Sequence, residues 1–118
     1  MYIIEKSFSF SASHQLCDLP PEHPCAKVHG HNYSVRLCLK GEELDDTGML
    51  LDYRSLKPFK AYLDSTYDHM HLNDMCEFHP TAENLARELF AIAKGLFGNI
   101  VHAVHVKETE KTSACYYE

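Results

Sequence analysis

The sequence predicts an α+β fold in which a four-stranded antiparallel sheet carries two helices on one face. Two stretches near the N-terminus and two shorter ones near the C-terminus alternate between apolar and polar residues, and this period of two indicates half-buried strands. Between these pairs, two segments carry apolar residues at helical spacing. The resulting order, ββααββ, is typical of a sheet with helices packed against one face. The length of 118 residues predicts one domain, residues 1–118.

The first strand is expected over residues 2–14. Its even positions are mostly apolar and end with His14, whereas the odd positions from 7 to 13 are all serine, so one face should be buried and the other solvated. The segment 17–24 contains three prolines and should form a loop that leads to Cys25.

The second strand is expected over about residues 28–41. His29 and His31 are two residues apart, so their rings lie on the same side of an extended strand, on its apolar face. If this strand pairs antiparallel with the first, His14 meets them at one end of the sheet. Neutral imidazole is the commonest metal ligand, and three imidazoles match a catalytic zinc site whose fourth position is open. An isolated His-x-His pair, by contrast, is more often a polar surface pair.

Two helices are expected between the strand pairs. The first should begin with Asp52 or Ser55 as its N-cap and end near Thr66. The second should begin with Thr81 as its N-cap and end at Gly98. It carries an apolar stripe that we interpret as core, made of Leu85, Leu89, Ile92 and Leu96.

The third strand is expected over about residues 99–108 and the fourth over residues 112–117. Glu108 closes the otherwise apolar face of the third strand, a position where a carboxylate is usually solvated. A sheet of four strands leaves two open edges, and such edges are often paired with another chain. We therefore expect a homo-oligomer.

The composition argues against several classes of protein. The formal net charge of −6 disfavours non-specific binding to nucleic acid or to anionic membranes. No apolar run approaches the ~20 residues that span a membrane, and the N-terminus lacks the layout of a signal peptide. The five cysteines are odd in number and lack the spacing of a disulfide scaffold, so we expect reduced thiols and a cytoplasmic protein.

Five motifs together resemble the 6-pyruvoyl-tetrahydropterin synthase family over nearly the whole chain. In chain order they are Cys25-x3-His29-Gly30-His31-Asn32-Tyr33 with His14 upstream, Gly48-Met49-x2-Asp52-Tyr53, Asp68-His69-x2-Leu72-Asn73, Pro80-Thr81-x-Glu83-Asn84, and Glu108-Thr109 followed by Ala114-x-Tyr116. Each motif alone is weak, but the set is specific. Within the family, the short chain and the first motif are most similar to the 6-carboxy-tetrahydropterin synthase branch, which acts in 7-deazaguanine (queuosine) biosynthesis.

The resemblance implies a role for each matching residue. The family's zinc ligands are matched by His14, His29 and His31. Cys25 matches the catalytic thiol, which accepts a proton, and Asp68 and His69 match the pair that relays it.

The pterin ring would be anchored by Glu108, which is sometimes grouped with the relay, and Thr81 would help to line the pterin pocket. Lys27 is our own candidate for a phosphate contact. We assign no role to His71, an additional histidine in the third motif.

The resemblance also implies an assembly and a reaction. In the tunnelling fold, the sheets of three subunits join into a barrel and two trimers stack into a homohexamer, so the catalytic residues need not come from one chain. The implied substrate is 7,8-dihydroneopterin triphosphate, and zinc is the implied cofactor. The carboxy branch eliminates triphosphate and also cuts the side chain, which releases acetaldehyde. Two alternatives remain open: a 6-pyruvoyl-forming synthase, and a non-enzymatic zinc-binding or thiol-sensing module.

Overall fold

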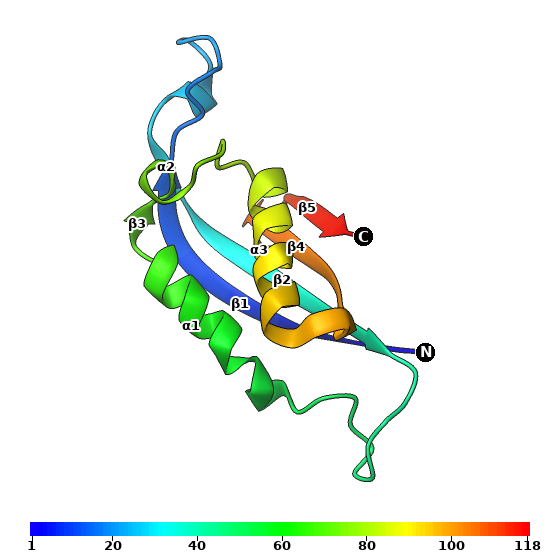
Figure 1. Cartoon of the computed structure of the whole chain (residues 1–118). Coiled ribbons are helices and arrows are strands. Elements are labelled where there is room, and N and C mark those ends of the chain that lie inside the picture. The colour runs from blue at the N-terminus through cyan, green and yellow to red at the C-terminus, as the bar shows by residue number, and fades with distance from the viewer.

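A mixed sheet of five strands runs through the computed structural model, which describes residues 1–118 (Figure 1). The strands are β1 (Tyr2–His14), β2 (His29–Gly41), β3 (Met70–His71), β4 (Val101–Thr109) and β5 (Thr112–Tyr117), in the spatial order β3-β1-β2-β4-β5. The helices are α1 (Lys57–Thr66), α2 (Leu72–Met75) and α3 (Ala82–Phe97), and 3₁₀ turns occupy Pro24–Ala26, Tyr53–Leu56 and Gly98–Ile100. The predicted α+β class is confirmed.

The long antiparallel pair β1–β2 is the centre of the sheet. Its register runs without interruption from Tyr2 opposite Gly41 to His14 opposite His29. The even side chains of β1 turn towards the helices, and Phe8 and Phe10 are buried there, while the serines between them face the other side. The predicted pairing of the two strands is confirmed.

The prediction of four antiparallel strands was wrong in one respect, because a fifth strand runs parallel to β1. In β3, Met70 lies opposite Ala12 and His71 lies opposite Ser13. Two residues are too few to show a period of two, so the sequence pattern could not reveal this strand. The chain leaving α1 therefore returns along the outer edge of β1 instead of remaining a loop.

The predicted start of the first helix also needs correction. Asp52 does cap a helical turn, since its carboxylate accepts a hydrogen bond from the Arg54 N–H, but that turn is 3₁₀. The α-helix follows it, with Leu56 at the N-cap and Pro58 in the first turn, where a missing N–H costs no hydrogen bond. The helix ends at Thr66, as predicted. A short third helix, α2, was not predicted.

Helix α3 begins and ends as predicted but is rotated about its axis. The Thr81 hydroxyl accepts a hydrogen bond from the Asn84 N–H, and Gly98 ends the helix with a φ of 75°. The buried residues are Ala82, Leu85, Ala86, Leu89, Phe90 and Ala93, whereas Ile92 is half-buried and Leu96 is 45% exposed. The small alanines let the helix lie close to the sheet, and the ring of Phe90 packs edge-on against Tyr116 at 5.2 Å between centroids.

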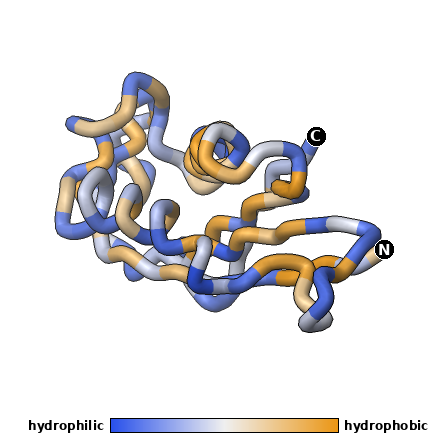
Figure 2. The backbone as a smooth tube through the Cα atoms, turned by 60° about the horizontal axis from the view of Figure 1, so that its bottom comes forward, coloured by the Kyte–Doolittle hydropathy of each residue, from blue (hydrophilic) through white to orange (hydrophobic).

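Helices and sheet enclose one hydrophobic core. In Figure 1, α3 crosses β2 and β4 while α1 runs beside β1, and Figure 2 shows hydrophobic positions recurring along the strands. Aromatic rings pack between and within the layers. Phe8 of β1 lies edge-on to Phe59 of α1 at 5.2 Å, and within the sheet Phe10 of β1 stacks on Tyr33 of β2 at 4.9 Å. None of the helices has the length and hydrophobicity that crossing a bilayer requires.

The C-terminal hairpin extends the sheet on the other side of β2. Strand β4 begins at Val101, two residues later than predicted, because Gly98–Ile100 forms a 3₁₀ turn after α3. The pairing of β2 with β4 shifts register between Cys38 and Leu39, which indicates a β-bulge. The alternation of apolar and polar residues in the sequence does not predict this bulge. Strand β5 spans 112–117, as predicted, and forms one edge of the sheet.

The rotation of α3 predicts that two leucines of the same helix contribute very differently to stability. Leu89→Ala removes a fully buried side chain and should lower the free energy of unfolding by about 2–5 kcal/mol. Leu96→Ala changes an exposed position and should stay within about 0.5 kcal/mol. Urea denaturation at equal protein concentration measures both, and a larger loss for Leu96→Ala would contradict the rotation.

Candidate functional site

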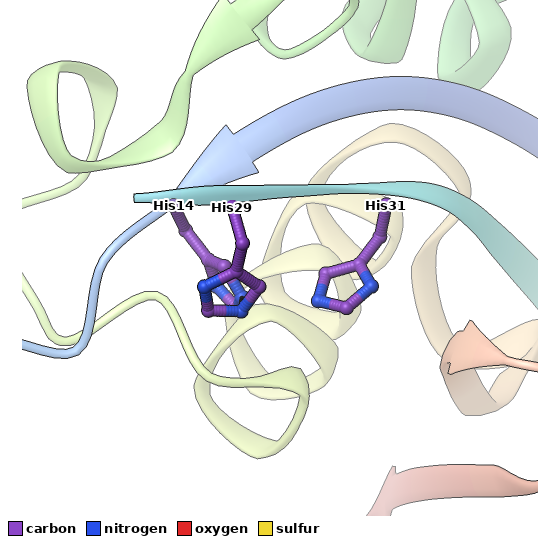
Figure 3. A group of neighbouring side chains, drawn as sticks. All are labelled: His14, His29 and His31. Atoms are coloured by element: carbon purple, nitrogen blue, oxygen red, sulfur yellow. Dashed lines mark hydrogen bonds between the residues drawn. The ribbon is translucent and has the colours of Figure 1, made fainter. Parts of the chain in front are cut away.

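Three histidine rings meet at one end of the β1–β2 pair. His14 lies opposite His29, and His31 lies opposite Ala12, so all three side chains leave the same face of the sheet. Figure 3 shows the rings below the strands, turned towards one another. One nitrogen from each ring lies within 4.8 Å of the others. The predicted convergence of the three imidazoles is confirmed.

Hydrogen bonds orient two of these rings. The Nδ1 of His14 lies 2.7 Å from the Pro80 carbonyl oxygen, and the Nδ1 of His29 lies 2.7 Å from the Lys27 carbonyl oxygen. A carbonyl oxygen only accepts, so each Nδ1 carries the proton and each Nε2 has a free lone pair. The two Nε2 atoms are 2.8 Å apart. Two lone pairs at this distance repel each other unless a cation lies beside both, and the arrangement therefore fits a metal ion.

His31 completes the triad with a nitrogen that has no hydrogen-bond partner. Its Nε2 is buried, and the nearest carboxylate oxygen, Oε2 of Glu108, is 3.6 Å away, too far for a hydrogen bond. Burial lowers the pKa of His31, and this effect exceeds the opposite effect of Glu108, so the ring is neutral at pH 7, the form that binds a metal. An orphaned buried nitrogen next to two oriented rings is what a three-histidine metal site requires.

Two partners of the triad were not assigned by the sequence analysis. The Pro80 carbonyl lies just before α3. It is a backbone group, so the pattern of side chains in the sequence could not predict its contact with His14. The Tyr33 hydroxyl lies 3.2 Å from the Nδ1 of His14, and Tyr33 is fully buried. Burial raises the pKa of Tyr33 well above its usual value, so it remains a neutral phenol. Its place two residues after His31, on the same face of β2, was the available signal.

Asp68 and His69 contact each other on the edge of β1, away from the triad. The Nδ1 of His69 is 3.0 Å from Oδ2 of Asp68. The Ser11 N–H donates to Oδ1 of Asp68 at 2.9 Å and, together with the His69 ring, holds the pKa of Asp68 below its usual value. His69 has a φ of 61°, a left-handed conformation that is uncommon for a residue with a side chain and that concentrates at functional sites.

His69 lines a cleft of about 460 Å³ on the serine-bearing face of the sheet. Ser11, Ser13, Asn32 and His71 contribute to its walls, and the Ser13 hydroxyl lies 2.8 Å from the Nδ1 of His71. The histidine triad leaves the opposite face of the same strands. One chain therefore carries the triad and the Asp68–His69 pair on two different faces.

Cys25 lies in the 3₁₀ turn Pro24–Ala26, within the loop between β1 and β2 that projects beyond the sheet in Figure 1. Its side chain is half-buried and its thiol has no hydrogen-bond partner. It is not a member of the group whose ligand atoms lie within 4.8 Å of one another. The structure brings Cys25 into hydrogen-bond contact with neither Asp68 nor His69.

The remaining predicted residues lie on either side of the triad. Glu108 approaches His31 and lines a cavity of about 380 Å³ together with Ala82, Glu83 and the start of β5. Thr81 caps α3, directly after the Pro80 carbonyl that holds His14. The Lys27 side chain is exposed, and only its carbonyl serves the triad. A triad with a carboxylate and a cavity at its side can hold a metal ion and a small polar ligand.

Comparisons with known proteins agree with this geometry. The family model described as 6-pyruvoyl tetrahydropterin synthase matches residues 3–118. A 6-carboxy-5,6,7,8-tetrahydropterin synthase of Synechocystis sp. is 36% identical, with 99% of this chain and 94% of the relative covered. The enzyme of the same name from Bacillus subtilis is 32% identical, with 97% of this chain and 83% of the relative covered.

A solved structure is similar over the same length. The 6-pyruvoyl tetrahydropterin synthase of Caenorhabditis elegans superposes with a TM-score of 0.87 at 31% identity, covering 99% of this chain and 95% of the other. The full-length sequence match and the shared fold agree with a histidine triad built at one end of the central strand pair. The chain belongs to the 6-pyruvoyl tetrahydropterin synthase family.

Proposed function

We propose that this protein is a zinc-dependent lyase of 7-deazaguanine (queuosine) biosynthesis. It converts 7,8-dihydroneopterin triphosphate and one water molecule to 6-carboxy-5,6,7,8-tetrahydropterin, acetaldehyde and triphosphate. The observation that carries the proposal is the oriented histidine triad with its orphaned nitrogen, in a chain whose relatives named for this activity align over nearly their whole length.

The proposed metal ligands are the Nε2 atoms of His14 and His29 and a ring nitrogen of His31. Three protein ligands leave an open coordination position, which distinguishes a catalytic zinc site from a structural one. When bound there, zinc polarises the hydroxyl oxygens of the substrate side chain and stabilises negative charge that develops on them.

Proton transfer is assigned to Cys25, Asp68 and His69. Cys25, whose sulfur has no hydrogen-bond partner, acts as the thiolate and accepts a proton from a side-chain carbon of the substrate. His69 shuttles the proton, and Asp68, which remains a carboxylate, orients the ring and stabilises its charged form. His69 has an uncommon left-handed backbone, and 83% of its side chain is exposed.

Substrate binding is assigned to the groups around the cavity beside the triad. Glu108 accepts paired hydrogen bonds from the pterin ring amide and exocyclic amine, and Thr81 lines the same side. Lys27, exposed beside the triad, contacts the triphosphate.

A homohexamer, in which sheets of three chains form a barrel and two barrels stack, would complete this site. Two features support the assembly. The sheet ends in the unpaired edge of β5. The proton relay lies on a different face from the triad, so a second copy would be needed to bring His69 to a substrate held beside the triad. All five cysteines are free, two of them exposed, which agrees with a reducing, cytoplasmic setting.

The alternative activity is 6-pyruvoyl-tetrahydropterin formation, in which triphosphate is eliminated without side-chain cleavage. It is favoured by the similarity to the Caenorhabditis elegans structure. A non-enzymatic zinc-binding module would need a fourth protein ligand, and Cys25 lies outside the group of converging ligand atoms. The non-enzymatic module would therefore be the conclusion only if the protein binds metal but shows no turnover.

The triad predicts that each chain binds about one zinc ion. Replacing one of the three histidines should remove that ion. His29→Ala should bind almost no zinc, because two imidazoles hold the ion poorly. His79→Ala is the matched control, since His79 pairs with Asp18 outside the triad and should retain the zinc. Elemental analysis after dialysis measures both, and equal zinc in the two variants would contradict the site.

The assignment of Cys25 predicts that Cys25→Ala keeps its zinc and its oligomeric state but loses turnover by a factor of about 10²–10⁴, the usual contribution of a positioned base. Cys76→Ala, which changes a half-buried thiol at the end of α2, outside the triad and the cavity beside it, is the control and should retain activity. Zinc loss in Cys25→Ala would make Cys25 a ligand instead.

The proposed reaction predicts a defined set of products. Zinc-loaded protein incubated with 7,8-dihydroneopterin triphosphate should yield a 6-carboxy pterin and acetaldehyde, both identified by mass spectrometry. A 6-pyruvoyl pterin without acetaldehyde would establish the alternative activity. If the intact, zinc-loaded oligomer forms no product, the protein is instead a non-enzymatic zinc-binding module.

A further inference from the structure

The loop that carries Cys25 is held by the two residues that follow His14. The Leu16 N–H donates to the Cys25 carbonyl at 2.9 Å. The side-chain amide of Gln15 donates to the Ala26 carbonyl at 2.7 Å. Both carbonyls next to the thiol are therefore tied to the chain segment that carries a metal ligand.

Gln15 is itself held from the other side by Asn73 of α2. The Gln15 N–H donates to Oδ1 of Asn73 at 2.8 Å, and Nδ2 of Asn73 donates to the Gln15 carbonyl at 2.7 Å. One side chain thus satisfies both backbone groups of one residue, just beyond the point where β1 ends. All three groups are partly buried, which limits competition from water.

No hydrogen bond fixes the position of the Cys25 thiol directly. The thiol makes no hydrogen bond, and the Cys25 N–H bonds only to His23 within the same loop. Without the amide of Gln15, the turn Pro24–Ala26 keeps a single hydrogen bond to the segment that follows β1, from the Leu16 N–H. The distance from Cys25 to the metal ligands therefore depends on the contacts of Gln15 and Asn73.

We propose that Gln15 and Asn73 are positioning residues that set the placement of the Cys25 thiol relative to the metal. Neither touches the reacting atoms: Asn73 fixes the backbone of Gln15, and Gln15 fixes the backbone beside Cys25. The catalytic consequence rests on the proposed function, whereas the placement of the thiol does not. The inference also gives Asn73 a role distinct from that of Asp68 and His69 in the same segment.

Gln15→Met tests the tie to Ala26, because methionine has similar length but no donor, while the backbone clamp by Asn73 remains. We expect kcat to fall by about 10- to 100-fold, the loss that a misplacement of about 1 Å causes, with KM and zinc content nearly unchanged. The control is Asp45→Ala, which removes a carboxylate that pins the distant loop around Thr47 and Met49 and should leave kcat unchanged. An unchanged kcat in Gln15→Met would overturn the proposal.

Asn73→Asp tests the clamp, because its second carboxylate oxygen would face the Gln15 carbonyl without a proton to donate. In both variants, iodoacetamide should label Cys25 several-fold faster than in wild type, as read by site-resolved mass spectrometry. Zinc loss in both variants would mean that the contacts of Gln15 and Asn73 position His14 and not the Cys25 thiol, which would overturn the proposal. If the wild type lacks turnover, the proposed function fails, and unchanged labelling of Cys25 would separately refute the positioning.

Discussion

The antiparallel register of β1 and β2 is the constraint on which the rest of the molecule depends. A shift by one residue would turn every side chain of β1 to the other face, burying serines and exposing Phe8, Phe10 and His14. The same shift would separate His14 from His29. The free energy of burying apolar side chains therefore also brings the three histidine rings together, so the register that folding selects is the one in which a metal ion could bind.

Much of the fold was predictable from periodicity, because each strand of the central pair has one buried and one solvated face. What could not be predicted depends on tertiary contacts. Strand β3 has two residues, and side-chain contacts flank it on both sides: Asp68 accepts from the Ser11 N–H and Asn73 accepts from the Gln15 N–H. Leu96 lies in the apolar stripe of α3, yet it is exposed because the helix turns its alanines and Phe90 to the sheet. Local sequence carries no record of either contact.

The site was predictable to a different degree for its two halves. Alternation placed the three histidines on one face, and the pairing of their strands completed the triad. The groups that orient two of the rings are the backbone carbonyls of Lys27 and Pro80. Every residue has such a carbonyl, so the sequence does not indicate which ones act in this way. The resemblance supplied Asp68, His69 and Cys25, and in the single chain the Asp68–His69 pair makes no hydrogen bond to Cys25. The proposed proton transfer uses all three residues and would therefore depend on subunit association.

The loop between β1 and β2 is tied close to where it leaves and re-enters the sheet, at Gln15–Leu16 and at Cys25–Ala26. The segment between these ties, residues 17–24, is a surface excursion whose ends are already closed. Doubling the length of such a closed loop costs only about 0.6 kcal/mol of chain entropy. The excursion can therefore vary in length during evolution, or accept an inserted peptide, while the thiol at its base keeps its place.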